Sequence, residues 1–392
     1  MEGQRKIDLG LEKDAFFKAY GRDRIVATHT LGCKVNQYET DAIRSQFEEK
    51  GYTVGDFDGF ADVYIVNTCT VTNIADKKSR QMLAKARKQN PQGLVVAVGC
   101  YAQTAKESLE ENHGIDLLVG NTKKSQVLSL VERHVKALGG GQGIQEETVE
   151  DMTRQTAYED LWTTRQEDRN KAHVKVQDGC DQFCSYCIIP FTRGRVRSRK
   201  PESVLAEVES LAAQGFREVV LAGIHLASYG KEFDGYGLID LLEELDRVEG
   251  LSKVHLGSLE PNLVGEAFLE RLARLSRFHP HFHLSLQSGS DATLARMNRK
   301  YDTASYREKV ALLRRAFPEA VLTTDIIVGF PGETEGEFAQ TLAFAKEMAF
   351  AHVHVFKYSP REGTVAAARK DQVDAGEKNR RSEILRQAFP EL

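Results

Sequence analysis

The chain has 392 residues, of which 41% are hydrophobic and 28% are charged, and its formal net charge is −4. This composition excludes a disordered or fibrous protein and a generally basic protein that coats nucleic acid, although it leaves room for a local basic surface. The length predicts two domains, because single cores usually stop growing near ~250–300 residues. No apolar run reaches the ~18–20 residues that cross a bilayer, and the start has no secretory apolar core, so we expect a cytoplasmic protein without membrane association.

Three strands, each followed by a cysteine, are predicted in the first part of the chain. The six cysteines of a cytoplasmic protein favour metal binding or catalysis over disulfides. Strands at 24–30, 63–67 and 94–98 alternate with helices at 39–50 and 74–90, which predicts a parallel α/β sheet. Cys33, Cys69 and Cys100 follow these strands at separations of 36 and 31 residues. Since parallel sheets gather ligands at the carboxyl ends of their strands, we predict that the three cysteines meet. The alternative is three unrelated loop cysteines.

Three consecutive glycines and an acidic stretch through Asp151 predict a linker after the first domain. We predict domain one at 22–140, the linker at 141–168 and domain two at 169–392. Six strand–helix units in roughly 200 residues predict a partial (βα)6 barrel of the TIM type, since a full eight-unit barrel usually takes about 250. Its strands are predicted at 173–177, 218–221, 253–256, 281–285, 321–328 and 352–356, with helices such as 201–214 and 334–348 between them.

A C-x3-C-x2-C motif formed by Cys180, Cys184 and Cys187 follows the first predicted strand of domain two. Thiolates at this spacing suit an iron–sulfur cluster or zinc. Zinc normally takes four protein ligands, whereas three cysteines on a four-iron cluster leave one iron open to another ligand. The motif therefore favours a cluster, and the alternative is a zinc site completed by a distant histidine such as His173 or His225.

This motif closely resembles that of the radical S-adenosylmethionine (SAM) superfamily. The resemblance implies a 4Fe-4S cluster on these cysteines, SAM bound to the open iron, and one-electron cleavage of SAM to a deoxyadenosyl radical. No side chain is assigned a catalytic role beyond the clusters. Where the superfamily more often has Gly-Gly-Glu, this chain has Leu221-Ala-Gly223. For Glu260, Gln287, Arg299 and the run 325–333, the alternative roles are helix caps, surface ion pairs or turns. The implied SAM contacts, near the carboxyl ends of the barrel strands, are Tyr186, Gly223, Glu260, Gln287, Arg299 and Val328.

The sequences around the first three cysteines, LGCKVNQYET, NTCTVT and VGCYAQ, resemble the amino-terminal domain of the radical SAM methylthiotransferases. The resemblance extends from about Arg24 to the end of the barrel. It implies a second 4Fe-4S cluster on Cys33, Cys69 and Cys100, whose open iron holds the transferred sulfur. It also implies two SAM molecules, one for the methyl group and one for the radical, and an electron donor and a sulfur source that the sequence does not identify.

Lys34-Val-Asn-Gln37, after the first cysteine, resembles the branch that modifies threonylcarbamoyladenosine in tRNA. We therefore predict addition of a 2-methylthio group to N6-threonylcarbamoyladenosine next to the anticodon. The alternatives are an isopentenyladenosine of tRNA, an aspartate of a ribosomal protein, or a non-catalytic iron–sulfur or zinc module that binds RNA. Lys34 and Asn36 have the alternative role of shaping the cluster loop.

Two basic segments predict contact with the phosphates of the tRNA anticodon loop. For the helix at 74–90 the alternative is a solvated face, and for Arg193 or Arg195 it is a bond within the cluster loop or to the cofactor carboxylate. Family members usually continue into a small RNA-binding β-barrel (TRAM) domain, whereas this chain ends at Leu392 after a predicted helix at 374–389. We therefore expect a truncated form with weak RNA affinity, or a variant that finds tRNA by other means. The basic residues are Arg193, Arg195, Arg197, Arg199 and Lys200, and Lys77, Lys78, Arg80, Lys85, Arg87 and Lys88.

Overall fold

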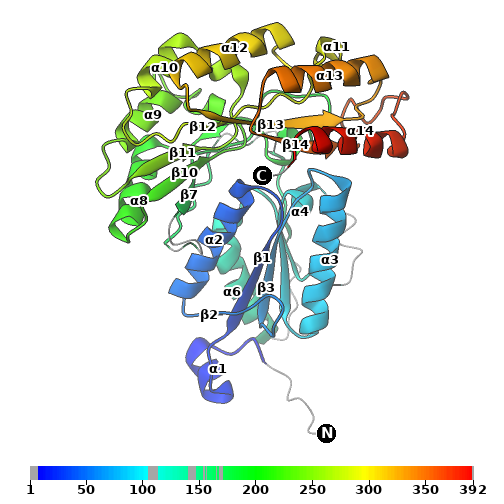
Figure 1. Ribbon diagram of the computed structural model, residues 1–392. Coiled ribbons are helices and arrows are strands. Elements are labelled where there is room, and N and C mark those ends of the chain that lie inside the picture. The colour runs from blue at the N-terminus through cyan, green and yellow to red at the C-terminus, as the bar shows by residue number, and fades with distance from the viewer. Residues whose placement is uncertain are drawn as a thin grey trace. The chain divides into compact units, whose positions relative to one another are not determined.

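The structure is a computed structural model that describes residues 8–104, 114–139, 147–152, 155, 157–164, 166 and 171–390. The chain divides into two compact units (Figure 1). Unit 1 consists of Met1–Glu167 together with Phe191–Gly194, and unit 2 of Asp168–Pro190 and Arg195–Leu392. Four residues that follow the start of unit 2 in the sequence thus fold with unit 1. The first residues of the predicted linker lie outside the described residues, and the predicted domain limits stay a prediction.

Unit 1 contains a six-stranded parallel sheet, which confirms the α/β class predicted for this part of the chain. The central strands β3 and β4 are buried at every position, as expected for apolar strands covered on both faces. In the order β2-β1-β3-β4-β5-β6, the strands are Thr53–Val54, Ile25–Thr30, Val63–Thr68, Leu94–Gly99, Leu117–Val119 and Glu147–Thr148.

Helices pack on both faces of this sheet, because alternate side chains of each strand enter different hydrophobic cores. Ile65 and Val96 share one core with residues of α2 and α6, whereas Val66 and Ala97 share the other with residues of α3 and α4. The bounds of the helices in unit 1 are α1 Lys13–Tyr20, α2 Lys34–Glu49, α3 Asn73–Gln89, α4 Cys100–Thr104, η1 Lys124–Gln126 and α6 Val127–Gly139.

Unit 2 contains six parallel strands in the order expected for consecutive βα units. Two three-stranded sheets, β11-β10-β7 and β12-β13-β14, are joined by hydrogen bonds from Leu259 N to His283 O (2.8 Å) and from Ser285 N to Leu259 O (3.0 Å). The strands are β7 Lys171–Lys175, β10 Glu218–Ala222, β11 Lys253–Leu256, β12 His281–His283, β13 Val321–Val328 and β14 His352–Lys357, and the antiparallel pair is β8 Gln177–Asp178 with β9 Arg197–Ser198.

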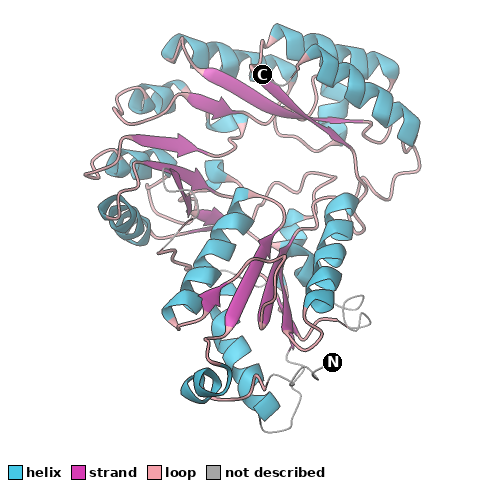
Figure 2. Ribbon diagram, turned by 60° about the horizontal axis from the view of Figure 1, so that its bottom comes forward, coloured by secondary structure: helices cyan, strands magenta, loops and turns pink. Residues whose placement is uncertain are grey.

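The helices of unit 2 cover one face of these strands (Figure 2). In β13, Leu322, Ile326 and Val328 enter the large hydrophobic core that contains residues of these helices, whereas Asp325 and Ile327 lie on the opposite face and are only partly buried. No helix in the described part of the chain is long and apolar enough to cross a membrane. The helices are α7 Ile189–Thr192, α8 Pro201–Ala213, η3 Leu226–Ser228, α9 Leu238–Leu245, η4 Pro261–Leu263, α10 Glu266–Leu272, α11 Asp291–Arg296, α12 Thr303–Ala316, α13 Glu335–Glu347 and α14 Ala375–Ala388.

Candidate functional site

The three cysteines of unit 1 lie together at the carboxyl edge of the sheet. Thr68 pairs with Gly99 across β3 and β4, so that Cys69 and Cys100 leave neighbouring strands at the same level. Cys33 caps the amino end of α2, and Cys100 is the first residue of α4 rather than a loop residue. Burial raises the pKa of Cys69, and the three thiols are close enough that the charges of Cys100 and Cys33 each raise it further. The sheet therefore brings the predicted trio together.

Two glycines allow this close approach of the strand ends. Gly99 has φ +94°, and a Cβ there would lie 2.3 Å from Asn67 Oδ1 and 2.7 Å from the Thr68 carbonyl oxygen. Gly32 has φ +104°, and a Cβ there would lie 3.0 Å from Cys69 Sγ. Because side chains are disfavoured at such φ angles and lack space here, both positions require glycine.

A buried arginine contacts the same site from the segment Phe191–Gly194. Arg193 Nε donates to Cys100 Sγ at 3.2 Å, Nη1 to Glu39 Oε1 at 3.0 Å and Nη2 to Asn36 Oδ1 at 2.6 Å. Lys124 also pairs with Glu39, and the side chains of all three charged residues are 0% exposed. Donors to a ligand sulfur tune the potential of iron–sulfur sites, so this arrangement fits a cluster held by the trio.

Two thiols of unit 1, those of Cys33 and Cys69, have a raised pKa in the protein without a metal. Burial raises the pKa of Cys69 to about 11. The residue Cys33 keeps exposed surface, but the protein atoms around its thiol raise that pKa as well. A bound metal favours the thiolate and releases the proton, so cluster assembly must supply the driving force for ionisation.

The three cysteines of unit 2 lie in one loop after β7 and β8. A turn with a hydrogen bond from Cys187 N to Cys184 O (3.0 Å) holds two of them. Burial raises the pKa of Cys180 to about 11 and that of Cys187 to about 12, and the neighbouring thiols contribute to both shifts. Cys184 Sγ accepts a hydrogen bond from Arg299 Nη1 at 3.2 Å. The second predicted trio is therefore also together.

The distances between thiols disfavour a single zinc ion at either trio. Tetrahedral zinc with Zn–S bonds of ~2.3 Å places its sulfur ligands about 3.8 Å apart. Among the described residues, the one group of three metal-binding side chains whose ligand atoms all lie within 4.8 Å contains no cysteine. In each trio at least one pair of sulfur atoms is therefore farther apart than in a tetrahedral zinc site, which fits a multi-iron cluster better.

Two of the residues predicted to contact SAM, Arg299 and Glu260, form a pair beside the cluster loop of unit 2, and a third, Gly223, lies against Gln177 of β8. Arg299 Nη2 lies 2.5 and 2.6 Å from the two carboxylate oxygens of Glu260, and Arg299 Nε donates to Tyr301 Oη at 3.0 Å. Gly223 directly follows β10. A Cβ at this position would lie 3.1 Å from Gln177 Oε1 and 2.9 Å from a Leu226 methyl carbon. The Arg299–Glu260 pair thus holds the sulfur of Cys184, and a role in binding SAM stays a prediction.

The other three predicted SAM contacts, Tyr186, Gln287 and Val328, have packing or backbone features of their own. The Val328 side chain is fully buried in the hydrophobic core, and its carbonyl oxygen accepts from Tyr358 N at 2.9 Å. Tyr186 packs edge-on against Phe330 with ring centroids 6.3 Å apart. Gln287, four residues after the end of β12, has a left-handed backbone with φ +66°. The sequence does not reveal these packing roles, and the predicted contacts of all three stay predictions.

His225 is a polar residue of this site that the sequence suggested only as a zinc ligand. Its Nδ1 hydrogen-bonds with Ser228 Oγ at 2.7 Å, whereas its Nε2 is buried without a hydrogen-bond partner in the described structure. Burial lowers its pKa, and the charges of Glu260 and Arg299 act on it. A buried nitrogen of this kind suits a ligand bound beside the cluster loop.

The prediction that the run 193–200 forms an RNA-binding surface is wrong for three of its arginines. Arg193, Arg197 and Arg199 are buried. Arg193 pairs with Glu39, Arg197 lies 3.9 Å from Asp178, and Arg199 pairs with Glu207. These three arginines neutralise carboxylates inside the protein. The basic composition of the segment suggested a solvated surface, but tertiary contacts bury it. In this run only Arg195 and Lys200 are exposed.

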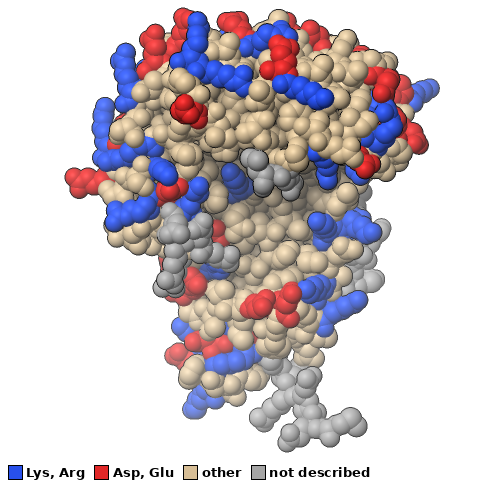
Figure 3. Space-filling model, in the orientation of Figure 1, with Lys and Arg blue, Asp and Glu red and all other residues tan. Residues whose placement is uncertain are grey.

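The predicted basic face of α3 is exposed in part. Lys77, Lys78 and Lys88 are exposed, whereas Lys85 pairs with Asp58 at 2.5 Å and Arg87 with Asp116 at 2.5 Å. Figure 3 shows Lys and Arg side chains over this helix, on the right of the view. Three lysines thus remain available to a polyanion on the helix that follows Cys69.

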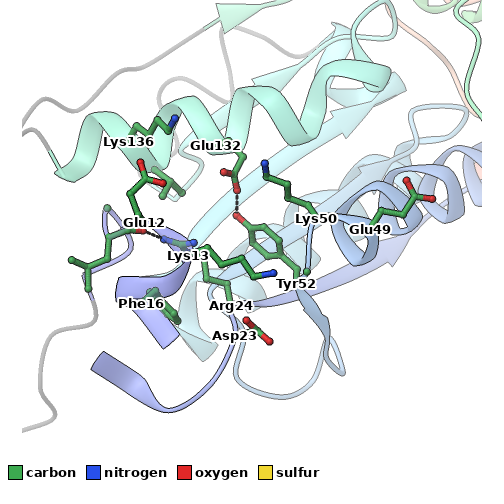
Figure 4. A pocket seen from close by; sticks show the side chains of 14 residues that line it. Glu12, Lys13, Phe16, Asp23, Arg24, Glu49, Lys50, Tyr52, Glu132 and Lys136 are labelled. Atoms are coloured by element: carbon green, nitrogen blue, oxygen red, sulfur yellow. Dashed lines mark hydrogen bonds between the residues drawn. The ribbon is translucent and has the colours of Figure 1, made fainter. Parts of the chain in front are cut away.

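A pocket of about 240 Å³ lies at the other edge of the unit 1 sheet (Figure 4). It is lined by Arg24 and Tyr52, which precede β1 and β2, and by Glu132 of α6. Tyr52 Oη donates to Glu132 Oε1 at 2.5 Å. The pocket is at the amino ends of the strands, so it is separate from the cysteines at their carboxyl ends.

Known proteins resemble this chain along most of its length. Residues 25–120 match an uncharacterized protein family, UPF0004, and residues 174–345 match the radical SAM superfamily. Threonylcarbamoyladenosine tRNA methylthiotransferase MtaB of Bacillus subtilis is 43% identical over 91% of this chain and 78% of its own. The protein of the same name from Aquifex aeolicus is 39% identical over 92% and 87%. A tRNA-2-methylthio-N(6)-dimethylallyladenosine synthase of Geobacillus kaustophilus is 35% identical over 96% and 71%.

Solved structures share the fold at low sequence identity. The radical SAM methyltransferase TsrM from Kitasatospora setae, with cobalamin and a [4Fe-4S] cluster bound, has a TM-score of 0.60 at 16% identity and covers 86% of this chain and 76% of its own. The cobalamin-dependent radical SAM enzyme OxsB has a TM-score of 0.57 at 12% identity, with 90% and 56% covered. These similarities support the fold.

Proposed function

Because this chain belongs to the radical SAM tRNA methylthiotransferases, we propose that it adds a 2-methylthio group to N6-threonylcarbamoyladenosine in tRNA, with one 4Fe-4S cluster in each unit. Membership of a transferase family rests on relatives 36–43% identical over most of the chain and on the match to the radical SAM superfamily. The observation that carries the proposal is the pair of cysteine trios, each at the carboxyl edge of a parallel sheet and each with an arginine donor on one sulfur.

Two-cluster chemistry is supported by the residues that surround each trio. When bound, the clusters and SAM supply the one-electron cleavage and the sulfur, which no side chain can provide. In unit 1, Arg193 donates to Cys100 Sγ and is itself held by Glu39 and Asn36. In unit 2, Arg299 donates to Cys184 Sγ and is held by Glu260. Each arginine therefore fixes the orientation of one sulfur ligand and stabilises negative charge on it.

The threonylcarbamoyl substrate is supported by overall similarity more than by the loop after Cys33. Relatives named for this nucleoside are 36–43% identical, and those named for dimethylallyladenosine are 35% identical. Asn36 Nδ2 donates to the Leu31 carbonyl at 2.7 Å and to the Thr68 carbonyl at 3.1 Å, and its Oδ1 accepts from Arg193. Asn36 thus shapes the cysteine site, so its identity carries little information about the substrate.

The test is nucleoside mass spectrometry. The protein with both clusters assembled is incubated with SAM, a reductant and tRNA that contains unmodified threonylcarbamoyladenosine. We expect 2-methylthio-N6-threonylcarbamoyladenosine and deoxyadenosine. Product formed only from isopentenyladenosine tRNA, or only on a ribosomal protein, would overturn the substrate assignment. No SAM cleavage by the assembled protein would favour a non-catalytic RNA-binding module instead.

A further inference from the structure

A group of metal-binding side chains that includes none of the six cysteines lies on three neighbouring strands of unit 2. His283 is in β12, Asp325 in β13 and His354 in β14, and one ligand atom of each lies within 4.8 Å of the others. Asp325 pairs directly with His354 in the ladder, and His283 pairs with Thr323, two residues before Asp325. Since side chains two residues apart in a strand share a face, all three side chains leave the sheet on the same side.

This face is the one opposite the helices. Phe282, Ile326 and Val355 alternate with the three residues and enter the hydrophobic core under the helices. The side chains of His283 and Asp325 are 16% and 26% exposed, and His354 is an exposed residue. An ion from solvent can therefore reach the group, while the sheet fixes the backbone positions of its ligands. Figure 1 shows β12, β13 and β14 side by side under α12 and α13.

Hydrogen bonds already orient the two histidines. His283 Nδ1 lies 3.0 Å from Thr323 Oγ1, which leaves His283 Nε2 facing Asp325 Oδ2 at 3.1 Å. His354 Nδ1 lies 3.1 Å from His352 Nε2. Metal-binding histidines usually make such a bond through the second ring nitrogen, because it fixes the tautomer and the ring orientation.

We propose that His283, Asp325 and His354 bind one divalent transition-metal ion, such as Zn²⁺. Imidazole and carboxylate donors suit this class of cation, and a set of three protein ligands leaves a position for water or for another oxygen ligand. Bonds of ~2.0–2.1 Å in a tetrahedral site place ligand atoms about 3.3–3.4 Å apart. The 3.1 Å between His283 and Asp325 is close to that separation, so small side-chain rotations complete the site.

The site is distinct from the predicted SAM contacts on the same strands. His283 precedes Gln287 by four residues, and Asp325 precedes Val328 by three. With a rise of ~3.3 Å per residue, the metal site lies about 10 Å farther from the carboxyl ends of the strands. The inference therefore goes beyond the proposed function and does not depend on it.

The test is zinc binding to the full chain with both clusters assembled. We expect one tightly bound zinc per chain, measured by mass spectrometry of the metal after desalting. Its X-ray absorption spectrum should show a nitrogen and oxygen shell at ~2.0–2.1 Å without sulfur. His283→Ala and the isosteric Asp325→Asn should lose this zinc while keeping the iron content. Thr323→Val, which removes the hydrogen bond to His283, should weaken zinc binding roughly 10–100-fold.

The matched control is His255→Ala, because His255 also pairs with a carboxylate, Glu218 at 2.7 Å, but beside Lys171 and Lys253. This variant should keep the zinc. No bound zinc, a sulfur shell at ~2.3 Å, or full zinc binding by His283→Ala would each overturn the proposal. None of these measurements uses tRNA, so loss of methylthiolation with zinc retained would count against the proposed function alone.

Discussion

The cysteine site of unit 1 depends on the whole sheet, whereas that of unit 2 depends on one loop. Cys33, Cys69 and Cys100 are separated by 36 and 31 residues and meet because β1, β3 and β4 are neighbours. Cys180 and Cys187 are separated by seven residues in a single loop. Two sites with the same number of thiols thus differ in what holds them together, and the first is the more sensitive to changes elsewhere in its unit.

Both sites nevertheless use the same local arrangement. In each, an arginine lies 3.2 Å from a cysteine sulfur and pairs with a glutamate. The difference is burial: the Arg193 and Glu39 side chains are 0% exposed, whereas those of Arg299 and Glu260 are 5% and 15% exposed. The predictions below test whether this difference matters, from the largest expected effect to the smallest.

Removal of either trio should abolish methylthiolation, but only one removal should abolish SAM cleavage. The assembled protein should contain about eight irons, and replacement of either trio by alanine should leave about four. Without Cys180, Cys184 and Cys187 no deoxyadenosine should form, because the implied SAM-binding iron is lost. Without Cys33, Cys69 and Cys100 it should still form. Iron analysis and chromatography of deoxyadenosine measure both, and unchanged iron in either variant would contradict the two-cluster arrangement.

Arg193→Ala should destabilise unit 1 by about 3–5 kcal/mol, because it leaves Glu39 buried beside one fewer cation. Arg299→Ala is the matched variant and should cost less, since Glu260 retains access to water. Denaturant unfolding followed by circular dichroism measures both losses. Electron paramagnetic resonance should show a changed signal for one cluster in each variant. Equal losses of stability would show that burial is not the decisive difference.

Gly99→Ala should destabilise the protein by about 1–3 kcal/mol, because alanine is strained at φ +94° and its Cβ would meet Asn67 and the Thr68 carbonyl. Gly215→Ala is the control: its φ is +98°, but nothing lies within 4 Å of the added Cβ. The difference in melting temperature between the two variants isolates the steric part at the cysteine site. A smaller loss for Gly99→Ala than for Gly215→Ala would contradict the close approach at Gly99.

Replacement of Lys77, Lys78 and Lys88 by alanine should weaken tRNA binding modestly. These exposed lysines follow Cys69 on α3. Loss of up to three phosphate contacts should make the plot of the logarithm of the binding constant against the logarithm of the salt concentration shallower by about three units. Binding measured across salt concentrations tests this, with exposed Lys346 of α13 replaced as a control. An unchanged slope would assign these lysines to a solvated helix face.

The sequence predicts the strands well because their apolar character is local. β11 and β13 begin and end at the predicted residues. α2 begins at Lys34, five residues before its predicted start, because tertiary packing buries polar residues of its first turns, such as Asn36 and Glu39. The six cysteines could be grouped from their spacing and their strands. The burial of Arg193 could not be predicted from the sequence, because it depends on contacts with residues more than 90 positions away.

The excursion of Phe191–Gly194 into unit 1 limits how the chain can be divided. A fragment that stops at the linker would lack Arg193 and also the Thr192 carbonyl, which accepts from Asn121 Nδ2 at 2.7 Å. The first half is therefore not a transferable module, and grafting it onto another barrel would require transplanting this tetrapeptide with it.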